Sequence, residues 1–93
     1  MIQSFKHKGL RELFEKGKTK KFPAEHLKKI KRLLDFVAAA HSSEDFNLPG
    51  KRLHKLKAPP YVDFYSLDVT GNYRLIFKFE NGLATDVNYI DTH

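Results

Sequence analysis

The chain has 93 residues, 41% hydrophobic and 13% aromatic, and a formal net charge of +6. This length fits one domain, residues 1–93, with a packed core, and excludes a second core. The sequence has no apolar run long enough to span a membrane, no secretory signal at its N-terminus and no cysteine for disulfides or zinc sites. These features favour a cytoplasmic protein.

The charge is unevenly distributed along the chain. Residues 1–57 contain 15 lysines and arginines and six acids, a net charge of +9, whereas residues 58–93 have a net charge of −3. A basic half joined to a mildly acidic half favours a polyanionic partner for the basic half. A solvated lysine-rich surface, or an acidic protein partner, would explain the same imbalance.

The first half predicts a short strand and two helices. Residues 1–5 are short and apolar at Ile2 and Phe5, and predict the strand. Residues 8–17 have apolar side chains at helical spacing, with Gly17 as the stop. A second helix is predicted over residues 24–40, with Pro23 at its start. Its apolar stripe comprises Leu27, Ile30, Leu33, Leu34, Phe36 and Val37.

The second half changes to the period of two that is typical of strands. A short extended segment, residues 52–60, is followed by alternating patterns over residues 61–69, 73–80 and 83–90. The predicted order is β-α-α-β-β-β-β. This order indicates an α+β domain with two N-terminal helices packed on an antiparallel sheet.

The dipeptide Asn81-Gly82 predicts a two-residue hairpin turn, because both residues tolerate positive φ. The turn predicts the register of the last two strands. The expected pairs are Glu80 with Leu83, Lys78 with Thr85, Ile76 with Val87, and Arg74 with Tyr89.

This register sorts the side chains between two faces. Tyr73, Leu75, Phe77 and Phe79 would share the core face with Ala84 and Ile90, and the opposite face would carry Arg74, Ile76, Lys78, Thr85, Val87, Tyr89, Asp91 and His93. Asp86 and Asn88 would point towards the core, which is unfavourable. A three-residue loop, 70–72, would bury Leu67 and Val69 and put Ser66 and Asp68 on the Arg74 face. A two-residue loop would reverse that arrangement and bury smaller side chains.

A cation, a histidine and a carboxylate on one face suit cleavage of RNA. His93 can transfer the protons of the 2′-OH and the leaving oxygen, Arg74 can hold the phosphorane charge, and Asp91 can orient His93. Further contacts are expected from Tyr89, by base stacking, and from His54, Lys55 and Lys57, as a second proton donor or phosphate ligands.

Plainer interpretations exist for two of these residues. A terminal histidine such as His93 is often merely exposed, and an arginine on a sheet face such as Arg74 is often solvated or salt-bridged. The histidine spacings match no metal site, so no metal ion or other cofactor is predicted.

The motifs "SFKHKGLRELFEKGKTKKFP", "RLHKLKA", "GNYRLIFKFENG" and "VNYIDTH" together resemble the HigB branch of the RelE/ParE toxin superfamily, also called plasmid maintenance system killer proteins. The resemblance covers nearly the whole chain. It implies a RelE-like fold with a curved sheet and a type II toxin that cleaves mRNA on the ribosome. It also implies neutralisation by a helix-turn-helix antitoxin, HigA, through which alone operator DNA would be contacted.

The resemblance also assigns roles to residues. His54, Arg74, Asp91 and His93 match the family's catalytic positions. The lysines expected to dock on ribosomal RNA are Lys20, Lys21, Lys28 and Lys31.

Two positions depart from the family pattern. Thr70 stands where an arginine is usual, and Thr92 stands where a tyrosine is usual. These departures keep two alternatives open: a non-enzymatic ParE-like inhibitor, for example of DNA gyrase, and a catalytically weakened toxin that acts mainly by binding its antitoxin.

Overall fold

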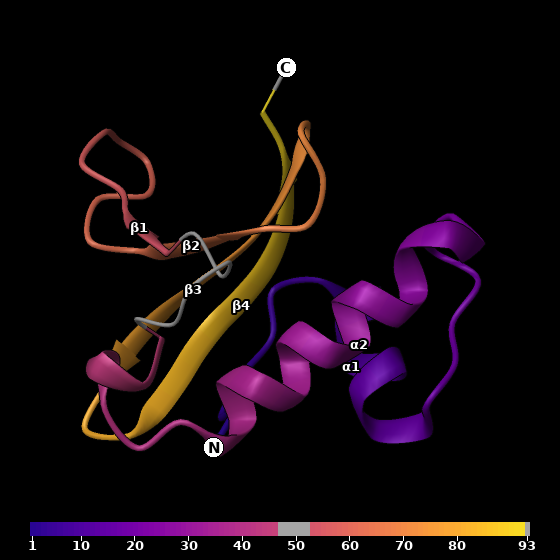
Figure 1. Ribbon diagram of the computed structural model, residues 1–93, viewed down its shortest axis with the longest axis horizontal. Coiled ribbons are helices and arrows are strands. Elements are labelled where there is room, and N and C mark those ends of the chain that lie inside the picture. Colours follow the sequence, from indigo (N-terminus) through magenta and orange to yellow (C-terminus); the bar gives the residue numbers. More distant parts are fainter. Residues whose placement is uncertain (47–52, 93) are drawn as a thin grey trace.

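The protein, described by a computed structural model over residues 1–46 and 53–92, has two helices followed by a four-stranded sheet (Figure 1). The helical elements are α1 (Lys8–Lys16), α2 (Ala24–Ala39) and a short 3-10 helix, η1 (Ser43–Phe46). The strands are β1 (His54–Lys55), β2 (Tyr65–Asp68), β3 (Tyr73–Glu80) and β4 (Leu83–Asp91). The α+β prediction and its order are confirmed. No helix within residues 1–46 and 53–92 is long and apolar enough to cross a membrane.

The N-terminal segment pairs with the sheet through isolated bridges rather than as the continuous strand that was predicted. It is joined to β4 by two isolated bridges, Ile2 with Ala84 and Phe5 with Val87, and both are parallel. The backbone N–H of Asp86 also donates to Ser4 Oγ at 2.9 Å. The segment therefore lines the outer edge of β4.

Local chemistry fixes the ends of both helices. His7 Nδ1 accepts a hydrogen bond from the Gly9 N–H at 3.0 Å and caps the start of α1. Gly17, with φ of 76°, ends that helix as predicted, because its N–H donates to the Leu13 carbonyl at 3.0 Å. Pro23 precedes α2, where its missing N–H leaves no helical bond unmade.

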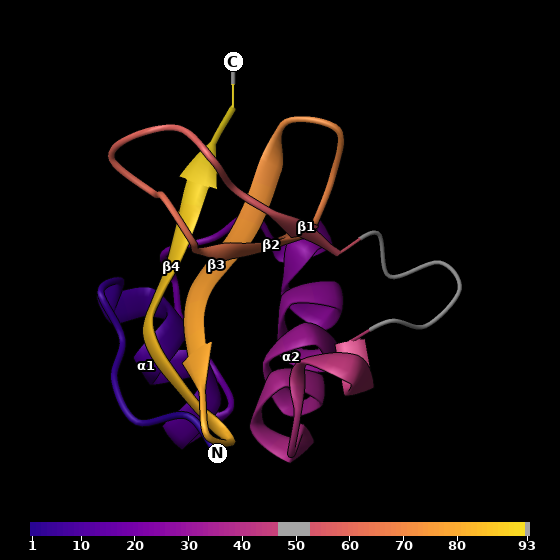
Figure 2. The same ribbon diagram turned by 90° about the vertical axis from the view of Figure 1, so that its left-hand side faces the viewer.

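The sheet has the order β1-β2-β3-β4, and every neighbouring pair is antiparallel. In Figure 1 both helices lie on one side of β3 and β4, while β1 and its connection to β2 lie on the other. Figure 2 shows β1 and β2 crossing in front of β3 and β4 at a steep angle. The sheet is therefore strongly curved.

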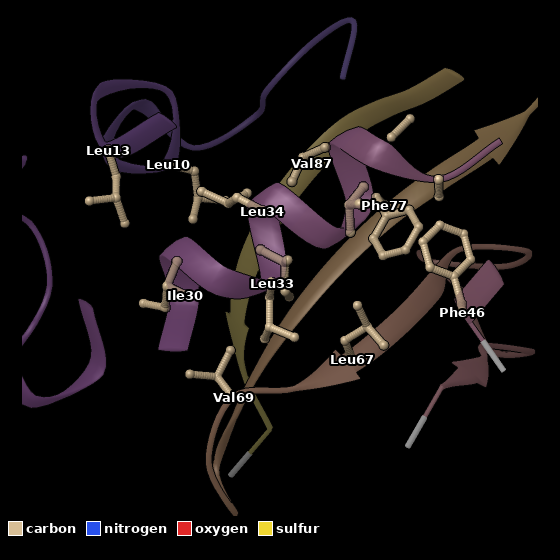
Figure 3. Packing of buried hydrophobic residues seen from close by; sticks show 14 of the residues in the cluster. Leu10, Leu13, Ile30, Leu33, Leu34, Phe46, Leu67, Val69, Phe77 and Val87 are labelled. Atoms are coloured by element: carbon tan, nitrogen blue, oxygen red, sulfur yellow. The ribbon is translucent and has the colours of Figure 1, made fainter. Parts of the chain in front are cut away.

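The core lies between the helices and the sheet (Figure 3). Its fully buried members come from both helices, η1 and three strands: Leu10, Leu13, Ile30, Leu34, Val37, Phe46, Leu67, Leu75, Phe77, Ala84 and Val87. The predicted burial of Leu67 and Val69 is confirmed, and Asp68 pairs with Arg74 as the three-residue loop requires.

The predicted register of β3 and β4 is correct near the turn and wrong beyond it. Glu80 pairs with Leu83 and Lys78 with Thr85, as predicted, but Ile76 pairs with Asn88 and Arg74 with Ile90. The cause is a β-bulge between Ile76 and Lys78, where Asp86 takes a φ of 53°.

The extra residue at the bulge reverses the faces of β4 beyond Asp86. Val87 is fully buried and Tyr89 packs against the core, although both were predicted on the outer face. Ile90 was predicted in the core and instead pairs with Arg74, on the opposite face. Asp86 and Asn88 are thereby removed from the core.

The face away from the helices is less open than predicted. Ile76 is fully buried there, and Phe64, in the connection before β2, is 8% exposed. The Lys78 ammonium lies 5.3 Å from the centroid of the Phe64 ring. The connection from β1 to β2 therefore covers part of this face.

Candidate active site

His54 and Arg74 line the same cavity on the face away from the helices. The cavity has a volume of about 290 Å³, and its lining residues are His54, Leu56, Ser66 and Arg74. We call it the His54–Arg74 pocket. Strand pairing explains the arrangement, because His54 lies opposite Ser66 and Arg74 lies opposite Asp68, two residues further along β2. The structure therefore brings His54 and Arg74 to one cavity.

Arg74 forms an ion pair with Asp68 through Nη1 and Oδ1. The two side chains are 28% and 21% exposed. The plainer interpretation, that Arg74 is salt-bridged, is thus confirmed for this contact. A guanidinium group has five N–H donors, however, so one carboxylate does not exhaust it.

Ser66 forms the buried part of the pocket. It is 0% exposed, and its hydroxyl has no hydrogen-bond partner within the described part of the chain. A buried hydroxyl without a partner is uncommon in proteins. Ser66 and Asp68 were predicted on the Arg74 face, but no role in the chemistry was predicted for them. Their spacing of two residues in a strand was the sequence signal that both side chains lie on the face of the pocket.

The predicted placement of Asp91 beside Arg74 is wrong. Asp91 pairs with Tyr73, the neighbour of Arg74, so its side chain leaves the sheet on the opposite face. The bulge at Asp86 causes this reversal. His93 lies outside the described residues.

The end of β4 is fixed to the turn that precedes β3. The N–H of Thr92 donates to the Asn72 carbonyl at 2.7 Å, and Thr92 Oγ1 donates to the same oxygen at 3.0 Å. Thr70 Oγ1 in that turn accepts from the N–H groups of Asn72 and Tyr73, each at 3.2 Å. The two threonines that depart from the family pattern therefore make contacts within the turn and between the turn and β4.

Tyr89 also lies on the helix side rather than beside Arg74. Its ring stacks on Tyr73, with centroids 5.1 Å apart and planes 7° apart, and it meets the edge of Phe22 at 4.7 Å. Its hydroxyl is 3.4 Å from His26 Nδ1. Burial raises the pKa of Tyr89, and Tyr73 and Asp91 raise it further.

His7 and His26 belong to the same group of side chains as Tyr89. His7 stacks on Phe22 with centroids 4.9 Å apart, and His26 lies 5.7 Å from Tyr73. Burial lowers the pKa of His7, as does the ammonium group of Lys21, which suits a ring that must accept the N–H of Gly9. This aromatic–histidine cluster (His7, Phe22, His26, Tyr73 and Tyr89) joins the helices to the end of the sheet.

The lysines predicted to bind RNA are all exposed: Lys20, Lys21, Lys28, Lys31, Lys55 and Lys57. They do not gather at the pocket. Lys55 follows His54 in β1 and pairs with Tyr65, with its ammonium 5.6 Å from that ring, on the other side of the strand. Lys20 and Lys21 line a separate cavity in the connection between α1 and α2.

No metal-binding group is found in the described ranges, 1–46 and 53–92. No three histidine, cysteine, aspartate or glutamate side chains lie together there in a way that would hold an ion. The chemistry available at the pocket comes from an imidazole, a guanidinium and a hydroxyl.

Comparisons with known proteins identify the family. Residues 3–93 match the family described as RelE-like toxin of type II toxin-antitoxin system HigB. The chain is 41% identical over 93 residues to a protein named Endoribonuclease HigB from Proteus vulgaris, with 100% of both chains covered. It is 30% identical over 95 aligned positions to a protein named Toxin HigB-1 from Vibrio cholerae serotype O1, which covers 100% of this chain and 98% of the relative. The chain therefore belongs to the HigB family of RelE-like toxins of type II toxin–antitoxin systems.

Proposed function

We propose that this toxin is a metal-independent endoribonuclease that cleaves mRNA on the ribosome and so blocks translation. One observation carries the proposal: His54 and Arg74 converge in one cavity of about 290 Å³, in a chain of the HigB family. A proton-transfer group beside a fixed cation is what transesterification of RNA needs. We propose that residues 1–93 form a single catalytic domain.

The reaction begins with attack of a ribose 2′-oxygen on the adjacent phosphorus atom. The 2′-OH loses its proton, the bond from phosphorus to the 5′-oxygen breaks, and that oxygen gains a proton. The products are a 2′,3′-cyclic phosphate on the upstream fragment and a 5′-OH on the downstream fragment. His54 serves one of the two proton transfers, and Arg74 holds the negative charge that builds on the phosphate oxygens.

His93 is proposed for the other proton transfer. Support comes from the family match, which extends through residue 93. Tyr89 is not proposed as a base platform, because its ring is packed in the aromatic–histidine cluster.

The partners follow from the family and the charge. A helix-turn-helix antitoxin of the HigA kind is proposed to neutralise the toxin, with operator DNA contacted only through that antitoxin. Exposed lysines of the helical side, with Lys55 and Lys57, are proposed to contact ribosomal RNA and mRNA. Action on ribosomes implies a cytoplasmic location.

The test is cleavage of a defined mRNA on purified ribosomes, with both new ends mapped. The wild-type protein is expected to give internal cuts with a cyclic phosphate upstream. His54→Ala and Arg74→Ala are each expected to lower the rate about 10²-fold, the scale of losing a proton-transfer group or a charge-stabilising donor. His93→Ala is expected to have an effect of similar size.

His41→Ala is the matched control. His41 is an exposed histidine after α2, and it uses its backbone rather than its ring to contact Asp45. Its removal should leave the rate unchanged. Wild-type cleavage by both His54→Ala and Arg74→Ala would contradict the assignment of roles, and DNA damage without RNA cleavage would favour the ParE-like alternative.

A further inference from the structure

The acid opposite Arg74 has a position that suggests more than a surface ion pair. Asp68 is the last residue of β2 and Arg74 the second residue of β3, and the two are direct partners across the strands. Their ion pair joins Arg74 Nη1 to Asp68 Oδ1, and that oxygen is itself buried. The contact is thus built into the sheet next to the pocket.

A carboxylate beside a phosphate-binding arginine can act in two opposite ways. It can compete with the phosphate for the guanidinium, or it can hold the guanidinium in place while leaving other donors open. The lining of the His54–Arg74 pocket separates the two cases. Arg74 lines the pocket and Asp68 does not, so the carboxylate lies outside the lining of the cavity.

The free donors of Arg74 then remain available on the pocket side. The carboxylate contact involves Nη1, and a guanidinium has further N–H groups on Nη2 and Nε. A long side chain that is already fixed loses less freedom when it binds its ligand.

We infer that Asp68 is a positioning residue for the cleavage reaction: it fixes Arg74 so that the open side of the guanidinium faces the scissile phosphate beside His54. The inference rests on the proposed function of the pocket. It assigns to Asp68 an effect exerted only through Arg74, without contact with the RNA.

A double-mutant cycle tests this on ribosomes programmed with a defined mRNA. The proteins are wild type, Asp68→Ala, Arg74→Ala and the double variant. Asp68→Ala is expected to lower kcat about 10-fold with little change in KM, and to cause no further loss when Arg74 is already absent. Asp68→Asn should recover most of the rate, because its amide oxygen still accepts from the guanidinium. Asp35→Ala removes an exposed acid of α2 and is the matched control.

Three results would overturn the inference. The first is an equal loss from Asp68→Ala in both backgrounds. The second is an increase in kcat/KM, which would show that Asp68 competes with the phosphate. The third is failure of Asp68→Asn to recover activity although it folds normally.

A measurement that needs no catalysis separates this inference from the proposed function. The guanidinium N–H resonances of Arg74, identified by their loss in Arg74→Ala, should be protected from solvent exchange in the wild type and in Asp68→Asn. They should exchange rapidly in Asp68→Ala. If the wild type cuts no RNA, the proposed function fails, yet protection that persists in Asp68→Ala would still refute the positioning role.

Discussion

The Ser66 hydroxyl is buried in the sheet, where Ser66 pairs with His54 on the neighbouring strand. Within the described residues it has no hydrogen-bond partner. Leaving a buried hydroxyl without a partner costs about 1–3 kcal/mol. Such costs are tolerated chiefly where function requires the group. Ser66 is thus a residue whose stability and activity effects should have opposite signs.

Ser66→Ala is expected to raise the free energy of unfolding by about 1 kcal/mol, since it removes the unsatisfied group, while lowering the rate of mRNA cleavage. Chemical denaturation and the ribosome assay measure the two effects on one preparation. Ser42→Ala, at an exposed serine before η1, should change neither. A clear loss of stability in Ser66→Ala would mean that the hydroxyl is hydrogen-bonded after all.

At the scale of elements, the bulge in β4 decides which side chains reach which face. Asp86 takes a φ of 53°, a conformation that aspartate tolerates and β-branched residues avoid. Its carboxylate lies 3.8 Å from the Lys78 ammonium, and its N–H donates to Ser4 Oγ. The bulge is therefore held by the backbone and by the N-terminal segment.

Asp86→Val is expected to lower the free energy of unfolding by about 1–3 kcal/mol, because a β-branched residue is strained at this φ. Asp86→Gly should stay within about 1 kcal/mol of the wild type, since glycine adopts the conformation freely. Thermal unfolding followed by circular dichroism measures both. Equal destabilisation by the two substitutions would indicate that the carboxylate, rather than the backbone, holds the bulge.

The bulge also marks the limit of what the sequence could predict. The Asn81-Gly82 turn determined the nearest pairs correctly, and alternation placed Leu67 and Asp68 on their proper faces. His54 and Arg74 could be grouped through the family resemblance, although the sequence predicted no register for the segment that carries His54. Asp91 was misplaced because a bulge depends on what Val87 and Tyr89 pack against, and these partners include His26, 63 residues away from Tyr89 along the chain. The predicted burial of Asp86 and Asn88 was the local sign of the error.

At the scale of the whole molecule, the basic surface and the pocket lie on different sides of the sheet. Figure 1 shows α1 and α2 on one side and β1, with His54, on the other. The exposed lysines of the helical side include Lys20, Lys21, Lys28 and Lys31. Binding to RNA and cleavage of RNA should therefore respond to different substitutions.

Replacing these four lysines by alanine is expected to weaken ribosome binding and lower kcat/KM, while kcat at saturating ribosomes is retained. The dependence of log K on log salt should become shallower by about 0.7–0.9 for each phosphate that is no longer neutralised. Binding measured at several salt concentrations gives the slope. Lys8→Ala, outside the set, should have little effect. A wild-type slope in the fourfold variant would mean that these lysines are simply solvated.

The parallel bridges between the N-terminal segment and β4 have a consequence for synthesis. Ser4 and Asp86 are in contact across 82 residues of sequence, and the bridge of Ile2 requires Ala84, which is also near the end of the chain. Pairings of such long range form late, because the intervening chain must first be ordered. The sheet edge that holds β4 is therefore completed only after nearly the whole chain has been translated. A nascent copy of this toxin should therefore remain incompletely folded while it is still attached to the ribosome that synthesises it.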